Sequence, residues 1–148
     1  MKLFTFKVDN KRLLVFFLCL LAGFLILLDF LSANKFTTAS GIDDNASRVD
    51  FIKSLGVTPE DELFSQKEIV IPKKFGKVYL KYNELQKQAG YDLTKHSGEK
   101  ATVYTYRVPN FRGTTAYVNL IIFDGVIIGG DISAAEIDGF MLPLRKIE

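Results

Sequence analysis

The sequence predicts an α+β protein with an N-terminal transmembrane helix, followed by a small domain of two helices packed on an antiparallel sheet of about four strands. Three observations support this. Residues 13–31 form an apolar run, LLVFFLCLLAGFLILLDFL. Two later segments carry apolar residues at helical spacing. The last three β-rich segments follow one another with no helix between them, which is typical of an α+β domain.

The apolar run is long enough to cross a bilayer, which takes about 20 residues. Asp29 is its single charge, and no polar stripe marks one face, as a buried soluble helix would show. A cleaved signal peptide is the alternative. The best cleavage site, LSA at residues 31–33, places a bulky Leu31 where a small residue is needed, which favours an uncleaved anchor.

The flanking charges predict the orientation of this span. Lys2, Lys7, Lys11 and Arg12 precede it, and only Lys35 follows closely. The positive-inside rule then leaves the N-terminus in the cytoplasm and places the C-terminal domain outside.

The chain accordingly divides into a basic cytoplasmic segment (1–12), the transmembrane helix (13–31), a polar tether (32–43) and an extracytoplasmic domain (44–148). No cysteine follows Cys19, so no disulfide framework is expected in the domain. After residue 44 there are 14 Lys and Arg residues against 13 Asp and Glu residues. This balance gives no reason to expect a nucleic-acid partner.

Two helices are predicted in the domain. The first covers residues 44–56, with Asp44 or Asn45 as its N-terminal cap and Gly56 at its end. A strand is expected over 64–72. Pro72 then opens a second helix that runs to Gly90, and its apolar face comprises Phe75, Val78, Tyr79, Tyr82 and Leu85.

Three further strands are predicted over residues 102–108, 115–123 and 126–133, with Pro109 ending the first of them. Asp124-Gly125 between two β-rich segments predicts a two-residue type I′ hairpin turn. Both faces of this hairpin are apolar, so either helices cover both faces or one face meets a partner.

The glycines of FDGVIIGGDIS are assigned structural roles, because no helix with free N–H groups follows Gly130 to bind phosphate. The two-residue turn places Asn119 opposite Gly130 and Val118 opposite Asp131. A bulge or close backbone approach at the glycine pair would re-aim Asp131.

The residues offer little for catalysis. His96 is the only histidine and lies in a predicted solvated turn, so neither a zinc site nor a Ser/His/Asp set is expected, and no cofactor is implied. Asp131 and Glu136 stand in no recognised catalytic spacing. They nevertheless define the rival hypothesis, a cell-surface hydrolase that uses two carboxylates.

Four lysines at the second predicted helix are the candidate binding residues: Lys73, Lys74, Lys77 and Lys81. Positions 73, 77 and 81 fall on one helical face. Two lysines in a first turn oppose the helix dipole at about 0.3–1 kcal/mol each, which favours a use in binding an anionic surface. An ordinary solvated face is the alternative.

Several segments together resemble a bacterial family catalogued as domain of unknown function 4830. They are RVDFIKSLG, EIVIPKKFGKVYLKYNELQKQAGYDL, YTYRVPN and NLIIFDGVIIGGDISAAEIDGFM, which span about residues 48–141. The resemblance implies a basic N-terminus and a single membrane span. It supplies no catalytic residues.

The leading hypothesis is therefore a single-pass, membrane-anchored, extracytoplasmic binding or interaction module without catalysis. Its expected partners are the lipid bilayer, through the N-terminal helix, and an envelope protein or an anionic surface. Homo-oligomerisation is left open by the sequence.

The charge asymmetry generates a topology prediction. Protease added to intact, wall-stripped cells should remove the region after Ser32 and spare the N-terminus, because only the C-terminal part is outside. Immunoblotting with tags at the two ends measures this. Full protection of the C-terminal tag, with degradation only after lysis, would contradict the assignment.

Overall fold

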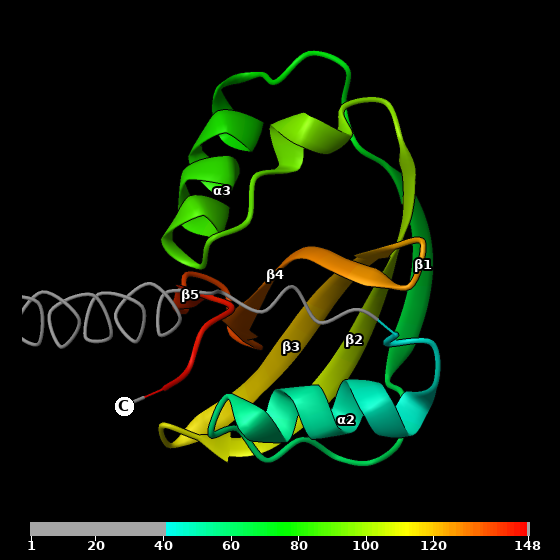
Figure 1. Cartoon of the computed structure of the whole chain (residues 1–148). Helices are drawn as coiled ribbons and strands as arrows, with labels where there is room; N and C mark the ends of the chain where they lie inside the picture. The colour runs from blue at the N-terminus through cyan, green and yellow to red at the C-terminus, as the bar shows by residue number, and fades with distance from the viewer. Residues whose placement is uncertain (1–40, 148) are drawn as a thin grey trace, which may run out of the picture. The chain divides into compact units, whose positions relative to one another are not determined.

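The computed structural model describes residues 41–147, which form a five-stranded antiparallel sheet with two helices packed against it (Figure 1). Strand order follows the chain, β1-β2-β3-β4-β5. The elements are α2 (Asn45–Ser54), β1 (Ser65–Val70), α3 (Lys77–Gln88), the 3-10 helix η1 (Leu93–His96), β2 (Lys100–Phe111), β3 (Thr114–Phe123), β4 (Val126–Ala134) and β5 (Met141–Pro143).

The predicted membrane span, residues 13–31, lies outside the described residues, as does most of the predicted tether. Within residues 41–147, no helix is both long and apolar enough to cross a bilayer. The backbone N–H groups of Gly41 and Ile42 both donate to Gly125 O, at 3.1 and 3.2 Å. Ile42 is buried, so packed structure begins slightly before residue 44.

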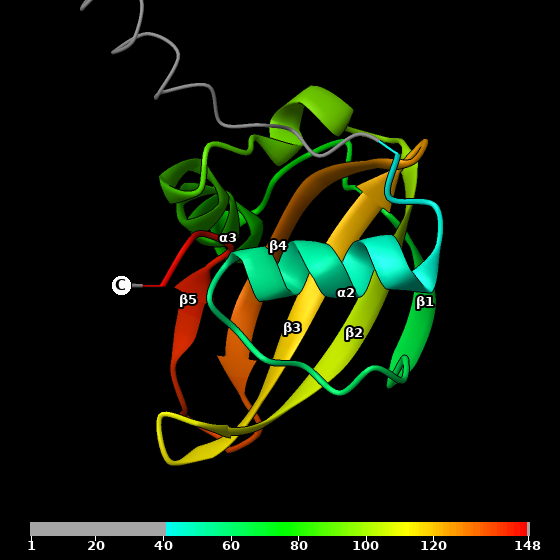
Figure 2. The same ribbon diagram turned by 60° about the horizontal axis from the view of Figure 1, so that its bottom comes forward.

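Helix α2 has the termini that the sequence predicts. The Asp44 carboxylate accepts a hydrogen bond from Ser47 N at 2.7 Å, which caps the N-terminus. Gly56 follows the helix with φ +81°, the left-handed conformation that suits glycine. The helix crosses one face of the sheet (Figure 2) and buries Val49 and Ile52 in the larger core.

The four predicted strands are present, and the C-terminal segment adds β5, which pairs with β4. Pro109 does not end β2, contrary to the prediction. The strand continues to Phe111, and the pairing with β3 is irregular between Val108 and Phe111. Proline is tolerated there because an irregular ladder does not require its missing N–H.

Helix α3 begins at Lys77, not at Pro72 as predicted. The backbone of Ile71 is hydrogen-bonded to the turn before β2: its N–H donates to Glu99 O, and its carbonyl accepts from Gly98 N. The chain then makes a short loop in which Phe75 packs on the smaller core, and Gly76 with extended backbone precedes the helix. Tertiary contacts thus delay the helix by about one turn.

The β3–β4 hairpin contains the predicted turn and a bulge. Asp124 and Gly125 have φ +50° and +68°, as a type I′ turn requires. Phe123 pairs with Val126 and Ile122 with Ile127, but Ile121 pairs with Gly129, so Ile128 is an extra residue in β4.

The bulge corrects the predicted register. Asn119 lies opposite Asp131, not Gly130, and Val118 lies opposite Ile132, not Asp131. A slip of one residue exchanges the two faces of a strand. Ile132 therefore joins the core under α2, and Asp131 points to the other face of the sheet.

Both faces of the hairpin are covered, as the first of the two alternatives predicts. The larger cluster lies between the sheet and α2 and includes Tyr106, Val118, Leu120 and Ile132. A smaller cluster on the opposite face consists of five buried residues, Ile71, Leu93, Ala101, Ile121 and Ile128, with Phe75 and Tyr82 packed against it.

Adding a methyl group at Gly125 or at Gly130 should lower the free energy of unfolding by different amounts. A Cβ at Gly130 would collide with the backbone oxygen of Asn119 and lie 2.8 Å from Leu144 Cδ2. At Gly125 the obstacle is the movable Asp43 carboxylate, and the main cost is the left-handed backbone, about 1–2 kcal/mol. Gly130→Ala should therefore destabilise more, near the top of the about 1–3 kcal/mol range for overpacking.

Urea unfolding of residues 41–148 measures both losses. Gly113→Ala is the matched control for Gly125→Ala, because Gly113 has φ +84° and no atom within 4 Å of an added Cβ. A Gly130→Ala loss no larger than that of Gly113→Ala would show that β3 and β4 do not approach closely at this point.

Candidate anionic-surface site

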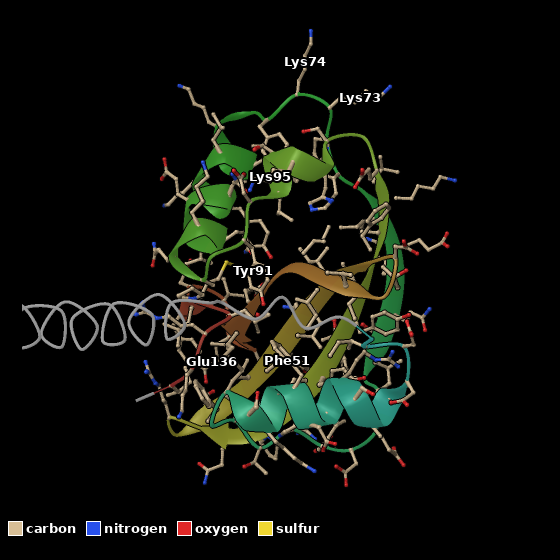
Figure 3. The ribbon with its side chains drawn as sticks, in the orientation of Figure 1. Phe51, Lys73, Lys74, Tyr91, Lys95 and Glu136 are labelled. Carbon is tan, nitrogen blue, oxygen red and sulfur yellow. The ribbon has the colours of Figure 1, made fainter. Side chains whose placement is uncertain are left out.

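The four candidate lysines surround the start of α3, although they do not form one helical row. Lys77 and Lys81 lie in α3, whereas Lys73 and Lys74 lie in the loop before it. The predicted alignment of 73, 77 and 81 is therefore wrong for its first member. Figure 3 shows Lys74 pointing away from this loop. All four residues are exposed, and they remain neighbours in sequence at one end of the helix.

No described acidic residue neutralises these lysines. The Lys and Arg ion pairs between residues 41 and 147 involve other cations: Lys53 with Asp61, Lys87 with Asp92 and Arg107 with Glu60. The four positive charges are thus available to an external anion.

The first turn of α3 also exposes apolar side chains. Val78, Tyr79 and Leu80 are 80, 49 and 48% exposed. The sequence predicted Val78 and Tyr79 on the buried face, and this is wrong. We call the seven residues together the α3-start surface: Lys73, Lys74, Lys77, Val78, Tyr79, Leu80 and Lys81.

The apolar residues are exposed because α3 packs through polar side chains. Asn83 and Gln86 are its buried residues. Asn83 donates to Asp92 Oδ1 at 2.9 Å and accepts from Leu93 N at 2.8 Å. Gln86 Oε1 accepts from Gly130 N at 2.7 Å, beside the bulge. These contacts fix which side of the helix faces the sheet, and Val78, Tyr79 and Leu80 remain outside.

A largely apolar groove of about 600 Å³ continues from this surface along α3. Met141 of β5 and seven residues of α3 line it, the latter being Val78, Tyr79, Lys81, Tyr82, Glu84, Leu85 and Gln88. One cation, Lys81, and one carboxylate, Glu84, therefore lie beside the apolar side chains of this groove.

Asp131 lies at the centre of a polar network beside α3. Its carboxylate accepts hydrogen bonds from Tyr82 Oη at 2.7 Å and from Asn119 Nδ2 at 3.0 Å. Asn119 Oδ1 in turn accepts from Thr105 Oγ1 at 2.8 Å. The network joins α3 to β4, β3 and β2 across the second face of the sheet.

Burial raises the pKa of the Asp131 carboxyl above its ordinary value, against the hydrogen bonds from Tyr82, Asn119 and Ser133 that lower it. Burial, and then the neighbouring Asp131 charge, raise the pKa of the Tyr82 phenol. Tyr82 thus stays protonated and serves as a donor to Asp131.

Asp131 and Glu136 lie in different environments and have different hydrogen-bond partners. Asp131 is buried within its network, whereas Glu136 is exposed and accepts from Thr114 Oγ1 at 2.8 Å. Neither lines the groove along α3. Among residues 41–147, no group of three or more His, Cys, Asp or Glu residues is placed to hold a metal ion.

His96 differs from the solvated turn residue that the sequence predicts. It ends η1, is partly buried, and its Nδ1 lies 2.7 Å from Glu99 Oε2. Its ring is also 5.7 Å from that of Phe123, centroid to centroid. These contacts give His96 a packing role in the turn before β2.

The described residues therefore define an α+β domain whose five-stranded antiparallel meander carries a helix against each face. Residues 51–132, more than half of the chain, match the family described as Domain of unknown function (DUF4830), and the chain belongs to this family. No curated protein and no solved structure matches the chain.

The buried Asp131 should give stability a distinctive pH dependence. A carboxyl whose folded pKa is raised contributes stability that is fully present below its unfolded pKa, about 3.9, and that is lost as pH rises through the folded pKa. Wild-type protein should thus lose stability relative to Asp131→Asn as pH rises from about 4 to about 8. Urea unfolding over this range measures the difference.

Asp92→Asn supplies a control of opposite sign. Hydrogen bonds from Thr94 and Asn83 hold the pKa of Asp92 at about 2. The advantage of wild type over this variant should shrink as pH falls. A wild-type advantage over Asp131→Asn that grows with pH would show that the Tyr82 and Asn119 hydrogen bonds outweigh burial.

Proposed function

We propose that this protein is a single-pass, membrane-anchored, extracytoplasmic binding module, and that its α3-start surface docks on an anionic membrane surface. One observation carries the proposal: the first turn of α3 places three exposed apolar side chains among lysines that have no described acidic partner. The N-terminus is cytoplasmic in this proposal, and residues 13–31 form the anchor.

The chemistry of this surface suits the headgroup region of a bilayer. Interfacial segments combine Lys or Arg with apolar side chains that enter the boundary between headgroups and acyl chains. Each lysine near an anionic surface contributes about 1 kcal/mol. Removing Val78 and Leu80 from water adds to this at about 25 cal/mol per Å². Lysine alone, without the exposed apolar residues, would be typical of an ordinary solvated face.

The predicted tether also supports a membrane as the partner. Gly41 and Ile42 are hydrogen-bonded to Gly125, so only residues 32–40 of the predicted tether can separate the anchor from the domain. They span at most about 30 Å when fully extended, at about 3.3–3.6 Å per residue. A domain on such a tether stays close to the bilayer that holds its anchor. Weak contacts then act at high effective concentration, because the second binding event is intramolecular.

The rival hypothesis, a hydrolase that uses Asp131 and Glu136, has less support. Each carboxylate already accepts hydrogen bonds from side chains of the domain. Asp131 accepts from Tyr82 and Asn119, whereas Glu136 accepts from Thr114. The contacts of Asp131 hold α3 on the sheet, which accounts for its burial without catalysis.

Vesicle sedimentation with residues 41–148 tests the proposal. This segment contains both core clusters and lacks the predicted anchor. It should bind vesicles containing phosphatidylglycerol more strongly than pure phosphatidylcholine vesicles. Lys74→Gln, Lys77→Gln and Lys81→Gln should together weaken binding by about fivefold per lysine, and salt should weaken it further.

The matched control removes three exposed lysines of α2, β1 and β2, with the changes Lys53→Gln, Lys67→Gln and Lys100→Gln. A second variant, Val78→Ser with Leu80→Ser, keeps every charge and should also weaken binding. Equal losses in the two lysine variants would indicate a response to net charge alone and would overturn the assignment of the site.

A further inference from the structure

A second basic site lies where the C-terminal segment meets the β2–β3 hairpin. It is a pocket of about 450 Å³, which we call the tail pocket, lined by Arg112, Leu142, Pro143, Arg145, Lys146 and Ile147. Three of these residues are cationic and none is acidic. We propose that the tail pocket binds the phosphate group of an organic phosphate ester.

The segment that carries two of the cations is fixed at both ends. Leu144, just before Arg145, is fully buried in the larger core. Ile147, just after Lys146, donates its N–H to Leu55 O at 2.8 Å. Arg145 N also donates to Pro143 O at 2.9 Å. Arg145 and Lys146 are therefore exposed side chains on a backbone that is held in place, so little order is lost on binding.

The third cation is positioned by the hairpin. Arg112 lies in the turn between β2 and β3 with φ +52°. Its Cζ is 5.6 Å from the centroid of the Phe111 ring, and this ring packs at 5.7 Å from that of Phe140. The guanidinium thus has an aromatic support on the same side of the domain as Arg145 and Lys146, with which it lines the pocket.

The three cations have no acidic partner among the described residues. None of them belongs to the ion pairs of residues 41–147. The carboxylate that reaches this hairpin, Glu136, accepts from Thr114 and does not line the pocket. Like charges gathered in a pocket repel one another, and an anion between them would turn this repulsion into attraction.

The residue types and the size of the pocket indicate the ligand class. Two arginines can each give paired N–H donors to phosphate oxygens, and a lysine adds a point charge. The pocket falls within the about 300–1,000 Å³ typical of small-molecule sites, which is larger than a bare phosphate needs. Leu142, Pro143 and Ile147 supply an apolar wall for the organic part of an ester.

The test uses the full chain in nanodiscs of neutral phosphatidylcholine, with glycerol 3-phosphate as the probe. Saturable NMR shifts are expected at the backbone and side-chain N–H groups of Arg112, Arg145 and Lys146, with none on adding glycerol. Arg145→Gln should weaken binding at least about tenfold, the loss expected for a hydrogen bond to a charged group. Arg112→Gln should act in the same direction.

Lys74→Gln combined with Lys77→Gln is the matched control, since it removes two charges from the α3-start surface and should leave the affinity for glycerol 3-phosphate unchanged. Discs that contain phosphatidylglycerol identify the source of the phosphate. Shifts of the same three residues without added ester would assign it to a lipid headgroup, and a response to the soluble ester alone would assign it to a soluble or polymeric ester. The proposal fails if neither form shifts these residues saturably, or if Arg145→Gln and Arg112→Gln leave the affinity unchanged.

Discussion

One extra residue in β4 determines how the two faces of this domain are used. Ile128 has no partner on β3, and beyond it every β4 side chain points to the face opposite to the one that an uninterrupted ladder would give. Ile132 consequently packs under α2, and Asp131 reaches Tyr82 on the other face. Without the bulge, a carboxylate would enter an apolar core, where an unpaired charge is very unfavourable.

The bulge also provides the attachment for α3. Gly130 N, next to the bulge, donates to Gln86, and Asp131 accepts from Tyr82. Two α3 side chains that are one turn apart are thus hydrogen-bonded to consecutive residues of β4. A helix attached through polar groups on its inner side can leave apolar residues outside without losing its orientation. The exposure of Val78 and Leu80, on which the proposed membrane contact depends, follows from this arrangement.

The sequence predicts those features that local chemistry decides. Asp44 caps α2 and Asp124-Gly125 forms the turn, because both depend on residues within a few positions. The start and inner face of α3 could not be predicted, since they depend on Gly98, Glu99 and Gly130, which are distant in the sequence. The glycine pair indicated a bulge, but not which residue would be left unpaired. The sequence does not point to Arg112, Arg145 and Lys146 as a binding site, because Arg112 is distant in the sequence from the other two. They come together only through the pairing of β5 with β4 and the burial of Leu144.

The position of the bulge is the central claim, and cross-strand backbone NOEs in isotope-labelled protein test it most directly. The account predicts that Val118 is directly opposed to Ile132 and Asn119 to Asp131. It also predicts an NOE contact between the Tyr82 ring and the Asp131 side chain. NOEs that oppose Val118 to Asp131 and Asn119 to Gly130 would show an uninterrupted ladder, and would contradict both the register and the attachment of α3.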